Sequence, residues 1–363
     1  MNQKKIVLGT GALIGALSVI LVVFGNPTNM GACIACFIRD IAGGLGLHRA
    51  GVVQYIRPEI PGFILGSMLI ALMTKEFQPR GGSSPLVRFI LGFFMMIGAL
   101  VFLGCPLRMV LRLAAGDLNA LVGLAGFAAG IWVGLIFVKK GFTLGRSHKL
   151  PVVNGLVLPS IAVVLLGLVV VAPAFIFFST EGPGSRHAPL LLSLLAGIII
   201  GIMAQRSRLC MAGGIRDLFL IKDAHLFIGF VAIFAVALVL NLTTGSFQLG
   251  FENQPIAHND GLWNFLGMFL VGYAAVLLGG CPLRQCILAG EGDTDAAITF
   301  LGMLVGAAFA HNFSLAASTA GVGVSGQVAV VLGIIVASGI GYAGLPQALR
   351  NTKQEVKGHV IHS

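Results

Sequence analysis

Charged side chains are scarce in this chain. Only 10% of its 363 residues are Asp, Glu, Lys or Arg, whereas 57% are hydrophobic and the mean hydropathy is +0.97. A soluble protein of ordinary composition carries about a quarter charged residues, so this composition excludes a water-soluble globular domain. The sequence predicts an all-α integral membrane protein, for which lipid is the solvent.

Cysteine and histidine are also few, and their placement argues against two further classes of protein. Six cysteines, mostly beside apolar segments, do not form the framework of a disulfide-stapled domain. The eight histidines fall mostly in loops or tails and form no cluster, so we predict no metal site and no other cofactor. The net charge of +10 is most simply explained by positively charged cytoplasmic loops, and we predict no nucleic-acid partner.

Ten apolar segments are each long enough to cross about 30 Å of hydrocarbon. The first follows Lys4 and Lys5 as a secretory signal would, but no small-residue cleavage site closes it, so we interpret it as a transmembrane helix. The ten segments lie near residues 6–24, 59–76, 86–104, 118–138, 155–178, 188–205, 224–242, 261–280, 294–313 and 325–345.

Lys and Arg predict how these helices are oriented, because cytoplasmic loops are enriched in both. With the N-terminus placed in the cytoplasm, the Lys- and Arg-rich loops fall on the cytoplasmic side and the C-terminus joins them there. The opposite loops 243–260 and 312–324 contain neither residue. The segment 25–58 is an exception, since it is placed outside yet contains three arginines, and we expect part of it to dip back into the protein.

The sequence contains a duplication. Residues 104–108 and 280–284 both read Gly-Cys-Pro-Leu-Arg, and each motif cysteine is followed eleven residues later by Gly-Asp. Cys33 and Cys210 each stand five residues before Ile-Arg-Asp, and they precede the second cysteine of their half by 72 and 71 residues. Shorter parts of the repeat are Phe77-Gln78 with Phe247-Gln248 and Gly126-x-x-x-Gly130 with Gly302-x-x-x-Gly306. Small residues at this last spacing are typical of a helix-packing face.

The duplication predicts two membrane repeats, 1–180 and 181–350, followed by a cytoplasmic tail, 351–363. Each half has five spans, and an odd number means that the second half enters the membrane inverted relative to the first. We expect each motif cysteine to lie on a short re-entrant helix, and the four re-entrant helices to meet near the midplane. Pro106 and Pro282 favour the first turn of such a helix, which places Cys105 and Cys281 at N-terminal ends.

The residues around the four cysteines predict an electropositive path. Helix N-termini attract anions, and one arginine lies three to six residues beyond each motif cysteine: Arg39, Arg108, Arg216 and Arg284. Arginine inside a membrane is costly and is expected to have a partner. The available carboxylates are Asp40, Asp217, Asp117 and Asp293, so the arginines either contact a substrate or lock the scaffold.

Thiols are an unusual lining for an anion path, and they suggest the kind of anion. A thiol is a weak hydrogen-bond donor but is soft and polarizable, which suits an anion with an exposed sulfur or selenium atom, and weak contacts also permit release. A single buried cysteine is more often an apolar filler, but repeat-related positions favour function. The predicted path residues are Cys33, Cys105, Cys210 and Cys281.

Two other classes of function remain open. Cys33 and Cys36 form a CxxC motif, which would fit a membrane thiol-redox protein, although the motif is weak without a second pair. A platform that docks a cytoplasmic sulfur carrier and moves nothing is the third possibility. Cys36 and Cys286 have no counterpart in the other half, where Gly213 and Val110 take their places.

The doubled Gly-Cys-Pro-Leu-Arg, the paired Cys…Ile-Arg-Asp segments and the length resemble the YeeE/YedE family of sulfur-compound transporters, and within it the YedE subgroup linked to selenium metabolism. The resemblance implies an hourglass-shaped protein of the bacterial inner membrane, in which the four motif cysteines pass a thiosulfate-like anion along by weak S–H contacts. It also implies a small cytoplasmic sulfur-carrier protein of the TusA/YedF type as a partner. The expected function is import of a small sulfur- or selenium-containing anion, without catalysis.

Overall fold

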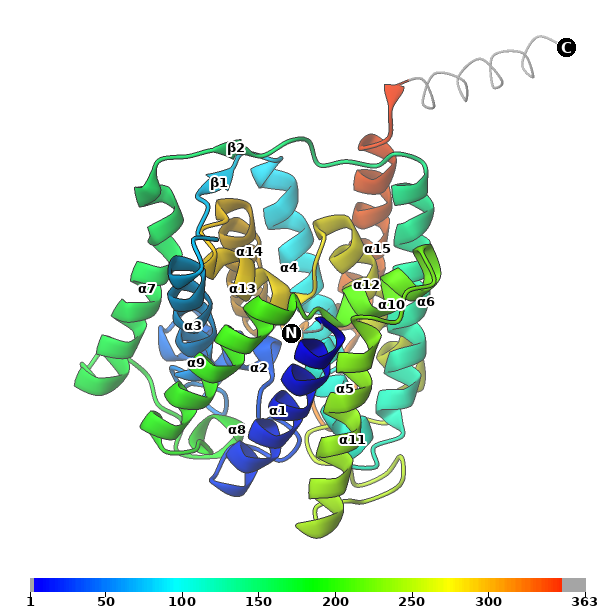
Figure 1. The fold of residues 1–363 in the computed structure, drawn as a ribbon. Helices are drawn as coiled ribbons and strands as arrows, with labels where there is room; N and C mark the ends of the chain where they lie inside the picture. Colours follow the sequence, from blue (N-terminus) through cyan, green and yellow to red (C-terminus); the bar gives the residue numbers. More distant parts are fainter. Residues whose placement is uncertain (1–2, 348–363) are drawn as a thin grey trace, which may run out of the picture.

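The computed structural model describes residues 3–347, so the predicted tail 351–363 lies outside the described residues. Each of the ten predicted spans coincides with one long helix in this part of the chain (Figure 1). The long helices are α1 (Gln3–Val23), α3 (Glu59–Met73), α4 (Pro85–Val101), α6 (Asn119–Lys139), α7 (Val152–Val171), α9 (Leu190–Ser207), α11 (Phe227–Thr243), α12 (Gly261–Leu278), α14 (Thr294–Asn312) and α15 (Val324–Ala343).

Short elements occupy the segments between the long helices. A two-residue antiparallel ladder joins β1 (Arg80–Gly81) to β2 (His148–Lys149), and it is the sheet found between residues 3 and 347. The short elements are α2 (Ile34–Gly44), β1 (Arg80–Gly81), α5 (Pro106–Ala114), β2 (His148–Lys149), α8 (Gly182–Ser185), α10 (Met211–Leu220) and α13 (Pro282–Gly290). The four predicted motif helices are therefore present, as α2, α5, α10 and α13.

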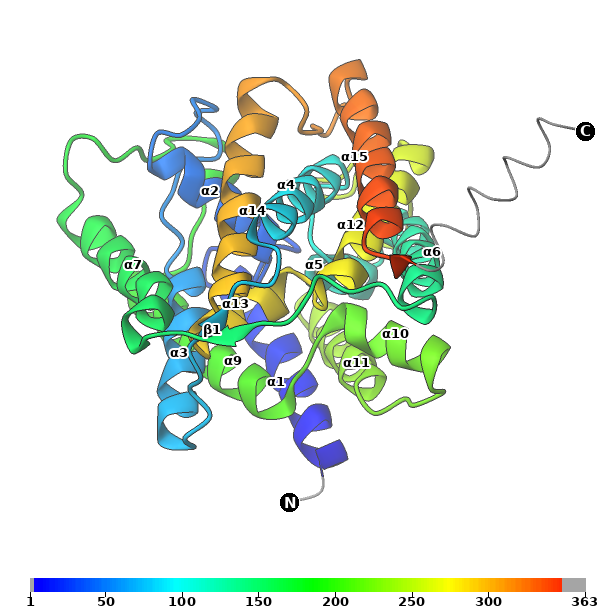
Figure 2. The ribbon, with the colours of Figure 1, turned by 90° about the horizontal axis from the view of Figure 1, so that it is seen from above.

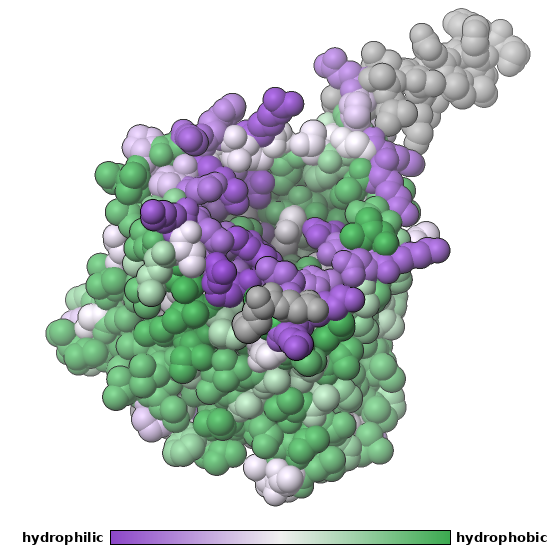
Figure 3. All heavy atoms as spheres, in the orientation of Figure 1, coloured by the Kyte–Doolittle hydropathy of each residue, from purple (hydrophilic) through white to green (hydrophobic). Residues whose placement is uncertain are grey.

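The length and composition of the helices confirm an all-α integral membrane protein. Within the described residues, eight helical runs are long and apolar enough to cross a membrane, and α3 and α11 are apolar but shorter. Hydrophobic residues cover the lower part of the face seen in Figure 3, and hydrophilic residues gather around a hollow on its upper part. β1 and β2 lie on this upper side (Figure 1), with the positively charged segments that join the helices there. We call it the basic face.

The helices pack in a twofold pattern that follows the duplication. α1 packs against α11 as α9 packs against α3, and α4 packs against α14 as α12 packs against α6. The short helices also meet across the halves, since α2 contacts α13 and α5 contacts α10. Seen from above, α5 and α13 lie within the outline formed by the long helices, and α7 and α15 lie at its outer edges (Figure 2). The inversion and the position of the short helices at the midplane stay predictions.

The packing face predicted from the Gly-x-x-x-Gly spacing is confirmed. Gly126 and Gly130 of α6 lie against the carbonyl oxygens of Phe265 and Phe269 of α12. The repeat-related contacts join α14 to α4: Gly302 to Phe89 and Gly306 to Phe93. The same spacing at Gly11/Gly15 and Gly197/Gly201 lets α1 pack on α11 and α9 pack on α3. Absence of a side chain thus lets backbones approach closely at four helix interfaces.

The repeated Phe-Gln segments join the two halves. The Gln78 amide donates to the carbonyl of Glu291 over 2.9 Å, and the Gln248 amide donates to the carbonyl of Ala115 over 2.8 Å. Two residues further on, Arg80 pairs with Gly292 and Gly250 pairs with Gly116 in the same manner. Each half therefore extends a strand-like segment onto the Gly-Asp loop of the other.

A buried histidine fixes the segment between α11 and α12. Nε2 of His258 donates to the carbonyl oxygen of Val101 over 2.7 Å, and its Nδ1 accepts from the Asp260 amide over 3.2 Å. The bond accepted by Nδ1 needs the neutral ring, and burial lowers the pKa of His258 below the ordinary 6.5. The segment is thus held by an imidazole that resists protonation.

We expect the melting temperature of the purified protein to fall as the pH is lowered from 8 to 5, and to fall less for His258→Gln. Because the pKa of His258 is lower in the folded state, its stabilising contribution is complete above about pH 6.5 and is lost as the pH falls below that value. Thermal unfolding in detergent at several pH values measures the difference between the two proteins. Parallel pH profiles would show that His258 does not titrate in this way.

Candidate functional site

Each motif cysteine is the N-cap residue of one short helix. Cys33, Cys105, Cys210 and Cys281 precede α2, α5, α10 and α13, have extended backbone conformations and are buried. Proline occupies the first turn of α5 and of α13. This confirms the predicted place of Cys105 and Cys281 at helix N-termini, and it shows the same arrangement for the other two cysteines. The thiols thus lie at the partly positive ends of four helices.

The four cysteines form two pairs, one in each half. Sγ of Cys33 lies 3.9 Å from Sγ of Cys105. In the second half, Sγ of Cys210 accepts the amide hydrogen of Cys281 over 3.4 Å. We call these the first and the second thiol pair. All four cysteines are free thiols.

Cys33 and Cys210 also make the same cap contact. Sγ of Cys33 accepts from the amide of Cys36, and Sγ of Cys210 accepts from the amide of Gly213, each over 3.3 Å. The extra thiol of Cys36 therefore lies directly beside the first thiol pair, where the second half has a glycine. Cys286 is buried in α13, and no hydrogen bond joins its thiol to another thiol among residues 3–347.

Arg108 is a buried cation beside the first thiol pair. Its side chain is fully buried, and its Nη1 lies 3.6 Å from Sγ of Cys36. The guanidinium donates to the carbonyl oxygens of Asn29, Ile256 and Leu103. None of the ion pairs found among the described residues involves Arg108. Since carbonyl dipoles hold the guanidinium without neutralising it, a positive charge remains next to three thiols.

Arg39 and Arg216 instead pair with the neighbouring aspartate in their own helix. Nη2 of Arg39 lies 2.7 Å from Oδ1 of Asp40, and Nε of Arg216 lies 2.8 Å from Oδ1 of Asp217. Asp40 is shared with Arg57, whose Nε lies 2.8 Å from its Oδ2. The buried Arg57 belongs to the segment predicted to dip back into the protein. Each of these two motif arginines is therefore ion-paired with an aspartate of its own helix.

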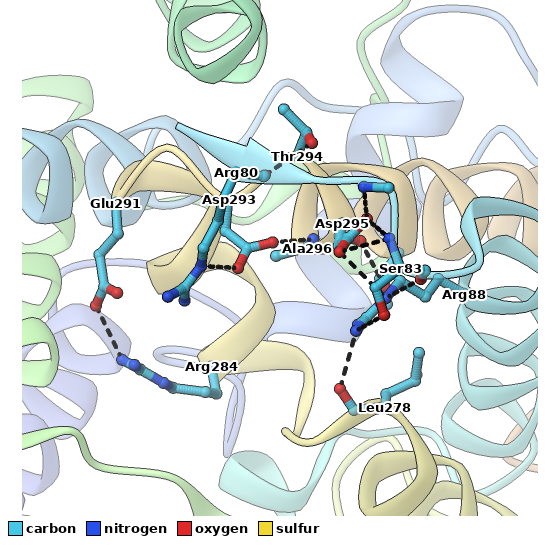
Figure 4. Close-up of polar contacts among 12 residues, drawn as sticks. Arg80, Ser83, Arg88, Leu278, Arg284, Glu291, Asp293, Thr294, Asp295 and Ala296 are labelled. Carbon is cyan, nitrogen blue, oxygen red and sulfur yellow. Dashed lines mark hydrogen bonds and ion pairs between the residues drawn. The ribbon is translucent and has the colours of Figure 1, made fainter. Parts of the chain in front are cut away.

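The aspartates of the two Gly-Asp loops do not pair with the motif arginines Arg108 and Arg284. Asp117 pairs with Arg112 at 2.6 Å inside the protein, and Asp293 pairs with Arg80 at 2.8 Å across the halves. Arg284 pairs with Glu291 at 3.2 Å. Figure 4 shows the Arg284–Glu291 pair beside the Arg80–Asp293 pair at the start of α14. Sequence reasoning missed Arg57, Arg112 and Glu291, although the last two lie within one or two helical turns of their partners.

A second network fastens the segment before α4 to α14. The Gly82 amide donates to the Asp295 carboxylate over 2.9 Å, and the Ser83 amide does so over 3.2 Å. Arg88 lies 3.7 Å from the same carboxylate and donates to the carbonyl oxygen of Ser83 (Figure 4). These contacts tie the segment that carries Arg80 to the loop that carries Asp293.

A polar cavity of about 170 Å³ opens beside Arg284 on the basic face. Three arginines, two glutamates and a glutamine line it: Glu76, Gln78, Arg80, Arg208, Arg284 and Glu291. We call it the basic chamber. Glu76 lies at its exposed rim, where hydrogen bonding from Gln205 and the charges of Arg208 and Arg206 lower the pKa of its carboxyl. The described residues contain no group of three His, Cys, Asp or Glu side chains placed to hold a metal ion.

Comparisons with known proteins identify a family and individual transporters that are similar to part of this chain. Residues 206–328 match the family described as sulphur transport, and this stretch includes the second thiol pair, Arg284 and Glu291. A thiosulfate transporter TsuA from Spirochaeta thermophila is 36% identical over 112 residues, which cover 30% of this chain and 33% of that protein. The TsuA of Escherichia coli is 29% identical over 103 residues, 28% of this chain and 29% of its own length. The matched stretch thus spans about a third of each relative. Residues 206–328, which include the second Gly-Cys-Pro-Leu-Arg motif, are thus similar to the sulphur transport family and to these two thiosulfate transporters.

Proposed function

We propose that the protein transports a small sulfur-containing anion of the thiosulfate type across the bacterial inner membrane, along a path lined by Cys33, Cys105, Cys210 and Cys281. The observation that carries the proposal is the unpaired, buried charge of Arg108 beside the first thiol pair and Cys36. A fixed cation at this depth favours an anion. Thiols next to it favour one whose outer atom is soft.

The two thiol pairs fit stepwise passage. An anion held at the first pair by Arg108 and by weak S–H donors is bound without strong hydrogen bonds, so it is released readily. The second pair presents the same chemistry at the N-termini of α10 and α13, followed by Arg284 and the basic chamber. The proposed route therefore ends at the basic face, which we assign to the cytoplasm because Lys and Arg are enriched there.

The proposed direction has an energetic consequence. Moving one charge against a membrane potential of 100 mV costs about 2.3 kcal/mol, so importing a dianion costs about 4.6 kcal/mol. A co-transported cation or rapid consumption inside must offset this term. A sulfur-carrier protein waiting at the basic face would supply such consumption.

Purified protein in liposomes tests the proposal. We expect vesicles containing the protein to take up radiolabelled thiosulfate faster than empty vesicles, with unlabelled sulfide and selenite added in turn to rank the substrates. Competition by selenite would extend the substrate class to selenium compounds. Vesicles no faster than empty ones would exclude transport and would leave a docking platform or a thiol-redox protein that uses Cys33 and Cys36. Of these two, only the redox protein would lose activity on Cys36→Ser.

A further inference from the structure

The two halves differ at one charged position next to their motif arginines. Arg108 and Arg284 are repeat-related, each lying three residues beyond its cysteine. Ten residues beyond the cysteine, the first half has Ala115 and the second half has Glu291. Arg108 is accordingly left without a carboxylate among the described residues, whereas Arg284 has one. The duplication thus preserved the cation and changed its counter-ion.

Glu291 lies between two guanidinium groups. Its Oε1 is 2.9 Å from Nη1 of Arg208 and 3.2 Å from Nη1 of Arg284, and the residue is 6% exposed. Figure 4 shows the Glu291 carboxylate and Arg284 pointing toward each other. Two arginines converging on one carboxylate oxygen make the arrangement that proteins use to bind oxyanions, since a guanidinium matches carboxylate, sulfate and phosphate alike.

Space for a free anion exists beside this carboxylate. The basic chamber measures about 170 Å³, well above the roughly 10–15 Å³ that one water needs. Arg80 and Gln78 line the chamber together with Arg208 and Arg284, so a small oxyanion would meet several donors there. Arg284 lies in the first turn of α13, and Cys281 is the N-cap residue of the same helix. The basic chamber is therefore next to the second thiol pair.

We propose that Arg208 and Arg284 form an oxyanion-binding site in the basic chamber, and that Glu291 occupies it as a built-in competitor. A small divalent oxyanion binds when the Glu291 carboxylate swings away from the two guanidinium groups. The site is weak because every incoming anion must displace a tethered one, whose effective concentration is high. Identifying the oxyanion as one arriving from the second thiol pair rests on the proposed function.

The competitor makes the two ends of the path unequal. At Arg108 no carboxylate competes, so an anion is held there by the full charge of the guanidinium. At Arg284 the guanidinium is already paired with the Glu291 carboxylate, so the anion is released easily. This asymmetry favours accumulation at the first thiol pair and discharge at the basic face, although the two halves share their motifs.

Equilibrium binding of radiolabelled sulfate to the purified full-length protein in detergent tests the site. Sulfate carries the divalent charge but has no exposed soft sulfur, so it favours guanidinium groups over thiols, and the change in its binding on substitution of Glu291 reports the basic chamber. We expect Glu291→Gln to bind sulfate about fivefold more tightly than wild type, because it keeps the shape and removes the competing charge. Glu252→Gln is the matched control: it makes the same substitution at an exposed residue between α11 and α12 that does not line the basic chamber, and we expect a change below about twofold.

As a single substitution, Arg284→Gln should weaken sulfate binding. Combined with Glu291→Gln, it should abolish the tighter sulfate binding that Glu291→Gln produces. Unchanged or weaker binding by a folded Glu291→Gln protein would overturn the inference and leave Glu291 a structural lock. Should that variant fail to fold, wild-type sulfate affinity in Arg284→Gln would overturn it instead.

Uptake into liposomes separates this inference from the proposed function. For thiosulfate, Glu291→Gln should lower both the half-saturating concentration and the maximal rate several-fold, because the anion is held longer at the exit. Tighter sulfate binding without any uptake by wild type would reject transport and keep the site. Uptake whose parameters Glu291→Gln leaves unchanged would keep transport and reject the competitor.

Discussion

Cys105→Ala is expected to reduce thiosulfate uptake about five- to thirtyfold. The substitution removes the thiol that lies 3.9 Å from Cys33, and with it a donor at the N-terminus of α5 and next to the charge of Arg108. Loss of one hydrogen-bonding group typically costs about 1–2 kcal/mol, and each 1.4 kcal/mol is tenfold in binding. Initial uptake rates of labelled thiosulfate into liposomes, normalised to the amount of reconstituted protein, measure the effect.

Cys286→Ala provides the control, because it also removes a buried thiol from a motif helix. Cys286 has no thiol neighbour among the hydrogen bonds of the described residues, and its repeat counterpart is Val110. We expect its uptake rate to stay within about twofold of wild type, the size of a minor packing change. If Cys105→Ala and Cys281→Ala both transported at the wild-type rate, a path of thiols would be the wrong explanation for the repeat.

Gly130→Val is expected to lower the free energy of unfolding by about 3 kcal/mol or more. A Cβ atom at position 130 would fall on the carbonyl oxygen of Phe269, which belongs to the backbone of α12 and cannot rotate away. α6 and α12 must therefore separate along one of the main interfaces between the halves. Thermal unfolding in detergent, followed by size-exclusion chromatography, measures the loss.

Gly167→Ala is the comparison, since Gly167 lies within α7 and a Cβ there meets no atom within 4 Å. Alanine is the better helix former, so this substitution should leave the melting temperature unchanged or raise it slightly. A Gly130→Val protein as stable as wild type would mean that α6 does not pack on α12 as closely as described.

The sequence predicted best those features that depend on neighbouring residues. Pro106 and Pro282 predicted where α5 and α13 begin, because proline favours the first turn. Asp40 and Asp217 were identified as partners of Arg39 and Arg216 because they are adjacent along the chain. The hydrophobic segments predicted all ten long helices for the same reason, since length and composition suffice for a membrane span.

Features that depend on distant parts of the chain could not be predicted in this way. Asp293 pairs with Arg80, which lies 213 positions away in the sequence. This ion pair therefore depends on how the two halves pack against each other. The unpaired state of Arg108 depends on carbonyl groups of Asn29 and Ile256, which carry no sequence signal. Proximity in the sequence indicates that the motif arginines lie near the thiols. Only the three-dimensional arrangement shows that Arg108 is held by carbonyl groups while the other motif arginines are paired with carboxylates.

The crossed pairing of the helices bears on how the protein is made. α6 is synthesised long before α12, against which its glycines pack, and α1 likewise precedes α11. As the ribosome releases the first half, the narrow glycine grooves of α1 and α6 are without the helices that fill them. The newly inserted chain must therefore stay open to late-arriving segments, and a gene split between the halves should yield protein only when both pieces are produced together in one membrane.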